Sequence, residues 1–161
     1  MTAEPEVFNM VTALQRWVAD RLGSLDLYTG REGFNVVTEE LGDILSAIEM
    51  NLAKIGLGIA VVTPSMTKGE RSGEVIVEIA IAINETPTIN RGASGTRISA
   101  MDVSLAVIGL FQNQAPDPWT PFQLQSARPV AAPDRPGFKT SIEWDVVFQT
   151  GTILQTQPIE T

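Results

Sequence analysis

Carboxylates are the side chains in this sequence whose types and spacing come nearest to supporting catalysis. Paired carboxylates can divide the roles of acid and base or nucleophile. Three pairs have suitable spacing: Glu39 with Glu40, Glu74 with Glu78, and Glu143 with Asp145. The first pair is adjacent in a predicted helix, so its side chains diverge. The other two lie on the faces of predicted strands, where a solvated sheet surface is the simpler interpretation.

The remaining chemistry is restricted by composition. The chain has no histidine and no cysteine, which removes the commonest general base, the commonest metal ligand and every thiol-based site. Residues 92–96 form a glycine-containing loop before a predicted helix, but they lack the Gly-Lys-Ser/Thr ending of a phosphate-binding loop. No segment repeats the ligand pattern of a calcium-binding loop. We therefore expect a protein that is not an enzyme and has no cofactor or bound metal.

The charge of the chain is strongly negative. Among 161 residues, 19 are acidic and 11 are basic, a formal net charge of −8. Such a surface repels nucleic-acid phosphates and anionic membranes. Residues 1–6 lack the features of a signal peptide, and no apolar stretch approaches the roughly 18 residues of a membrane span. We expect no membrane association and a cytoplasm-like compartment.

Hydrophobic periodicity predicts one α+β domain over residues 1–161. The expected elements follow the order α-α-β-β-α-β-β: helices over about 6–22, 38–55 and 100–113, and strands over 57–63, 74–84, 122–130 and 138–150. Pro64 should end the first strand, and Ser99 should cap the third helix. The core should cover about 39–150, with a tail over 151–161. Hairpins in this order favour an antiparallel or mixed sheet with helices mainly on one face.

Two polar turns and one tryptophan are candidates for a subunit or partner interface. The predicted loop over residues 84–97 is long, which favours function or mobility. The candidate interface residues are Asn90, Arg91 and Arg97 in this loop, Lys68 and Arg71 in the turn over 65–73, and Trp119. The arginines could equally be solvated loop charges. Under the interface hypothesis, replacing Arg91 and Arg97 by Glu should weaken assembly and leave the melting temperature nearly unchanged.

One stretch resembles a known family. An alternating strand leads into Glu85-Thr86-Pro87-Thr88-Ile89-Asn90-Arg91, then a Gly/Ser/Thr loop, then an apolar helix with Met101-Asp102-Val103 near its start. This pattern, with the closing strand over residues 144–150, resembles the tail terminator and tail-completion proteins of long-tailed bacteriophages, of the minor tail protein U type. The likeness covers about residues 40–150 and leaves the N-terminal helix unexplained.

The resemblance implies a structural virion protein. The family implies a homohexameric ring that ends the tail tube and contacts the neck or head-completion protein. From the net charge we further expect DNA to pass through the lumen without specific binding, since like charges repel. The expected location is the tail–neck junction of the virion, after assembly in the host cytoplasm. Independently, the helix over 100–113 is apolar around most of its circumference. It has more apolar surface than one small domain can bury. The alternatives are another neck component, such as a head-closure or connector-stopper ring, a small-ligand-binding domain, or an enzyme using carboxylates.

Overall fold

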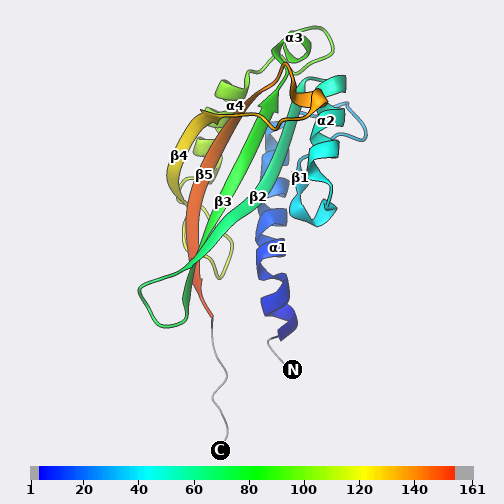
Figure 1. The fold of residues 1–161 in the computed structure, drawn as a ribbon. Coiled ribbons are helices and arrows are strands. Elements are labelled where there is room, and N and C mark those ends of the chain that lie inside the picture. Colours follow the sequence, from blue (N-terminus) through cyan, green and yellow to red (C-terminus); the bar gives the residue numbers. More distant parts are fainter. Residues whose placement is uncertain (1–3, 155–161) are drawn as a thin grey trace, which may run out of the picture.

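A five-stranded mixed sheet forms the centre of the computed structural model, which describes residues 4–154 and side chains from Phe8 onward (Figure 1). The strand order is β1-β2-β3-β5-β4. β1 pairs with β2 in parallel, and every other pair is antiparallel. The strands are β1 Val37–Thr38, β2 Leu57–Lys68, β3 Glu74–Glu85, β4 Gln123–Val130 and β5 Ile142–Ile153.

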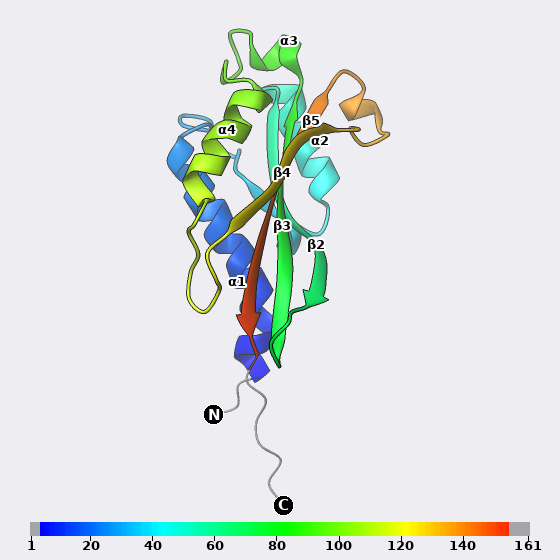
Figure 2. The same ribbon diagram turned by 90° about the vertical axis from the view of Figure 1, so that its left-hand side faces the viewer.

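The helices lie on both sides of this sheet. They are α1 Glu4–Leu22, α2 Ile44–Lys54, α3 Pro87–Asn90 and α4 Ala100–Phe111, with short 3-10 turns at Gly23–Leu25, Glu39–Leu41 and Pro136–Phe138. Viewed along the sheet edge, α1 and α4 cover one face and α2 lies against the other (Figure 2). The predicted α+β class is confirmed, and within residues 4–154 no helix is long and apolar enough to cross a bilayer.

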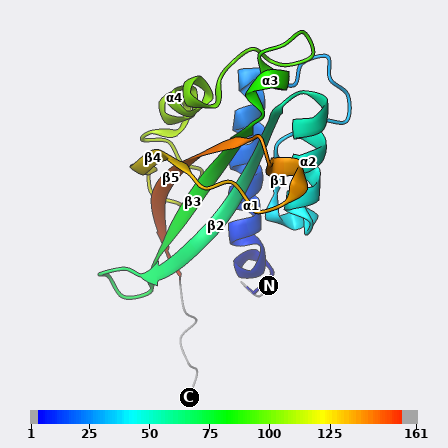
Figure 3. The same cartoon turned by 45° about the horizontal axis from the view of Figure 1, so that its top comes forward.

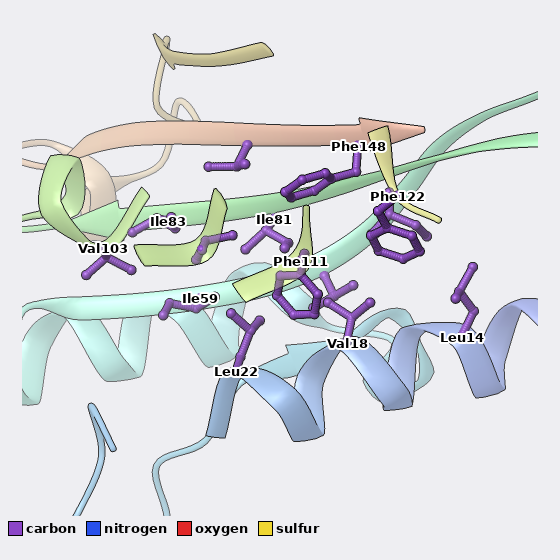
Figure 4. Close-up of a cluster of buried hydrophobic side chains, with 14 of the residues drawn as sticks. Leu14, Val18, Leu22, Ile59, Ile81, Ile83, Val103, Phe111, Phe122 and Phe148 are labelled. Atoms are coloured by element: carbon purple, nitrogen blue, oxygen red, sulfur yellow. The ribbon is translucent and has the colours of Figure 1, made fainter. Parts of the chain in front are cut away.

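The main core lies between the sheet and the helices α1 and α4. β3 is central, as predicted, because it pairs with β2 on one side and β5 on the other. Its alternate side chains Ile79, Ile81 and Ile83 are fully buried. Leu14, Val18 and Leu22 of α1 pack over them, and aromatic rings from α4, β5 and the segment before β4 fill one end of the layer (Figure 4).

A smaller core forms on the opposite face. Ile48 and Leu52 of α2 pack with Ala60 of β2 and with Phe138, which precedes β5. Gly58, two residues before Ala60, faces the same way, and a Cβ atom there would lie 2.9 Å from Cγ2 of Ile48. Small residues on this face of β2 therefore let α2 approach the sheet closely.

Several predicted boundaries are wrong. Pro64 does not end β2, because the register shifts between Val62 and Ser65 and the strand continues to Lys68. Such an irregularity accommodates a residue without a backbone N–H. The last strand begins at Ile142 and runs to Ile153, into the predicted tail, whose residues 155–161 lie outside the described chain. The second helix begins at Ile44 rather than near residue 38, with Asp43 as its N-cap.

Candidate functional site

The side chain of Glu85 organises the end of the molecule at which β3 stops. Glu85 is fully buried. Its Oε1 accepts a hydrogen bond from the backbone N–H of Ala100 at 3.0 Å, the first residue of α4. Its Oε2 accepts from Nδ2 of Asn90 at 2.7 Å and from Nε of Arg91 at 3.2 Å. One buried carboxylate thus joins the end of β3, the segment after it and the positive end of α4.

Asn90 completes this network from inside the segment. Its Oδ1 accepts from the backbone N–H of Thr96 at 3.1 Å and its Nδ2 donates to the carbonyl of Ile98 at 2.8 Å. Gly95 crosses so close to Asn90 that a Cβ atom would overlap the Asn90 backbone. The prediction that residues 84–97 form a connection without regular structure is therefore wrong in part. β3 continues to Glu85, α3 follows, and the rest is held by specific hydrogen bonds.

This anchoring presents one side of α4 to solvent. Ser99 caps the helix, as predicted, by accepting from the backbone N–H of Asp102. Val103, Val107 and Phe111 point into the main core and are buried. The opposite side carries large apolar groups that the described chain leaves uncovered: Ile98 is 41% exposed, Met101 59% and Leu105 70%. We call these three residues the α4 face.

A second apolar surface lies beside α2. A groove of about 520 Å³ is lined by residues that include Leu41, Ala47 and Met50. Leu41 is 55% exposed and Met50 is 53% exposed. We call this the α2 groove. Figure 3 shows α2 and α4 on opposite sides of the sheet, so the α4 face and the α2 groove belong to different sides of the molecule.

The four predicted basic residues do not form one patch. Arg91 and Arg97 lie at the end of the molecule where β3 stops, whereas Lys68 and Arg71 lie at the hairpin where β3 starts. β3 has 12 residues, so the two groups are separated by about 35–40 Å of strand. Arg71 forms a salt bridge with Glu74.

The other predicted interface residues have mixed outcomes. Trp119 is only 8% exposed and packs into the main core, so little of its ring is available to a partner. Asn90 is fully buried and holds the segment before α4. Arg91 is paired with buried Glu85, whereas Arg97 is exposed and adopts a left-handed backbone with φ of 66°. Glu85 was not among the predicted site residues, although it stands in the motif that carries the family resemblance.

The carboxylate pair of β5 differs from the expected solvated face. Glu143 and Asp145 are only partly exposed. Burial raises the pKa of Glu143 to about 8, with a further contribution from the neighbouring Asp145 carboxylate. Within the side chains that the structure describes, no three or more His, Cys, Asp or Glu residues form a metal-binding group. The pair is therefore a partly buried carboxyl pair in which the pKa of Glu143 is raised.

Comparisons with known proteins add no family to this description. None of the known protein-family models matches the chain, and a comparison with curated proteins finds no match.

Proposed function

We propose that this protein is a ring-forming assembly subunit, and specifically a bacteriophage tail terminator. The observation that carries the assembly proposal is the pair of unlike apolar surfaces on opposite sides of one chain, the α4 face and the α2 groove. A subunit with two different complementary surfaces associates head to tail, and a head-to-tail contact whose rotation closes generates a ring.

The proposed contact places the α4 face of one copy in the α2 groove of the next. Met101 and Leu105 stand one helical turn apart and project from a rigid element, because Glu85 fixes the start of α4. Met50 and Leu41 line the receiving groove. Large apolar side chains left this exposed on a small domain commonly mark an interaction surface.

The tail terminator assignment rests on the resemblance of the segment from β3 through α4 to that family. Two further features support it. The net charge of −8 suits a ring through which DNA passes without sticking, since like charges repel. The second feature is the position of α4, the helix that carries the α4 face. A ring subunit needs this helix to be fixed, and it is fixed by the motif Glu85-Thr86-Pro87-Thr88-Ile89-Asn90-Arg91.

Charged substitutions test the proposed contact. Leu105→Asp should block the α4 face and Met50→Asp should block the α2 groove, so neither variant should form rings alone. A mixture of the two should stop at dimers, because each variant keeps one of the two surfaces intact. Light scattering and electron micrographs, with and without tail tubes as templates, measure this. Ser72→Asp, at an exposed position in the turn between β2 and β3, lies outside both surfaces and is the matched control.

The biological role is tested by deleting the gene in the phage that carries it. A terminator deletion should leave filled heads without tails and tail tubes of abnormal length. Tubes of normal length that fail to attach would instead identify a head-closure protein. Fully infectious particles would refute a structural role.

A further inference from the structure

Three oxygen-bearing side chains project from neighbouring positions of two adjacent strands, on the sheet face opposite the main core. Asn84 of β3 lies directly opposite Glu143 of β5, and Asp145 is two residues further along the same strand. Their neighbours Ile83 and Val146 point into the main core. Because side chains alternate along a strand, Asn84, Glu143 and Asp145 all project from the other face.

Two of these side chains have a buried oxygen atom without a hydrogen-bond donor among the described residues. Asn84 is 1% exposed, and its Oδ1 accepts no hydrogen bond from any described residue. The Oδ1 atom of Asp145 is also buried without a donor in the described chain. Burying a polar atom without a hydrogen bond is unfavourable. Two such acceptors on adjacent strands leave this cluster with unsatisfied capacity for an electropositive group.

We propose that Asn84, Glu143 and Asp145 bind a divalent metal cation of the calcium, magnesium or manganese type. Hard cations of this kind take carboxylate and amide oxygens as ligands and complete their shell with water. Two carboxylates balance the double charge once the ion displaces the proton that Glu143 holds at neutral pH, and the amide adds a neutral ligand. Partial exposure of Glu143 and Asp145 gives the ion a route from solvent. This inference is independent of the proposed function.

The cationic side chain across from Asp145 does not already fill the position. Arg128 of β4 lies opposite Asp145 on the same face. It is exposed and forms none of the salt bridges found among the described residues. The segment between β4 and β5 is instead tied to α2, where Arg135 contacts Glu49 at 2.6 Å.

Manganese binding provides a direct test. The full chain is stripped with EDTA and titrated with Mn²⁺, and free Mn²⁺ is followed by electron paramagnetic resonance. We expect one bound ion per chain and a rise in melting temperature. Asp145→Asn should weaken binding by about tenfold or more, because ligand charge sets affinity in such sites. Asp134→Asn, an exposed carboxylate in the nearby segment, should bind as the wild type does.

A gain-of-function variant separates an ion from a buried water. Asn84→Asp supplies a third carboxylate, so it should bind Mn²⁺ more tightly than the wild type and regain stability when the ion is added. If a water occupies the position, this variant should be destabilised and Mn²⁺ should not restore it. That result would overturn the proposal, as would undetectable Mn²⁺ binding at millimolar concentration or unchanged binding in Asp145→Asn.

Discussion

Replacing Glu85 by Gln should cause a large loss of stability, although the two side chains have nearly the same shape. The substitution leaves one oxygen, which can still accept from the N–H of Ala100. It also replaces Oε2 by an NH₂ group, which then faces the donors of Asn90 and Arg91. Asn90 Nδ2 and Arg91 Nε would each lose this acceptor at a fully buried position, and would keep only the Ile98 carbonyl for Asn90 and the Oε1 contact of Arg91 Nη2.

The size of the effect follows from these contacts. A hydrogen bond to a charged group contributes about 1.5–3 kcal/mol, and breaking a buried charge pair costs about 3–5 kcal/mol. The Arg91 side chain is 56% exposed, so its share is about 0–1 kcal/mol. We expect Glu85→Gln to cost about 3–5 kcal/mol, mostly through Asn90 and the start of α4. For a chain of this length that corresponds to a fall of about 6–20 °C in melting temperature.

Urea and thermal unfolding, followed by circular dichroism, measure this loss. Glu32→Gln, at an exposed position, should be nearly neutral and serves as the control. A loss below about 1 kcal/mol for Glu85→Gln would refute the reasoning.

Substitutions of the two loop arginines should have different effects on stability. Arg91→Glu should destabilise the fold by placing a second negative charge beside Glu85, whereas Arg97→Glu should not, which revises the neutral outcome that the sequence suggested for the pair.

Three further substitutions test the fold and the carboxylate pair. Ile79→Ala should cost about 2–5 kcal/mol in urea unfolding, because it opens a cavity under the central strand; a nearly neutral result would contradict the sheet order. Gly95→Ala should lower the melting temperature by crowding Asn90, while Gly23→Ala, where a Cβ meets no atom within 4 Å, should not. The pKa of Glu143 is raised from 4.5 to about 8 in the folded chain, so its effect on stability becomes less favourable as pH rises through that window. In EDTA, Glu143→Gln should therefore stabilise the protein at pH 8 by about 1–2 kcal/mol after allowing for solvent screening. Near pH 4.5 the substitution should not stabilise the protein. Equal effects at both pH values would show that the pKa of Glu143 is not raised.

The helices and strands in which apolar residues recur at regular spacing could be predicted from the sequence. Alternation in β3 and β5 and the apolar stripe of α1 are local patterns, because each side chain's direction follows from its position in a strand or helix. Ser99 is likewise a local signal, since a cap bonds to a residue only three positions away.

Tertiary structure decided everything that depends on contacts distant in sequence. Periodicity indicates that α2 has an apolar side, but not which face of the sheet it covers; Gly58 and Ala60 decide that by leaving room on one face. Pairing with β3 carries β2 past Pro64, and the main core accepts Trp119 from a turn rich in proline. Glu85 and Asn84 are adjacent in sequence and both buried, yet the first is fully hydrogen-bonded and the second is not. The difference arises because strand alternation points them to opposite faces, where only one meets the donors of α4 and the segment before it.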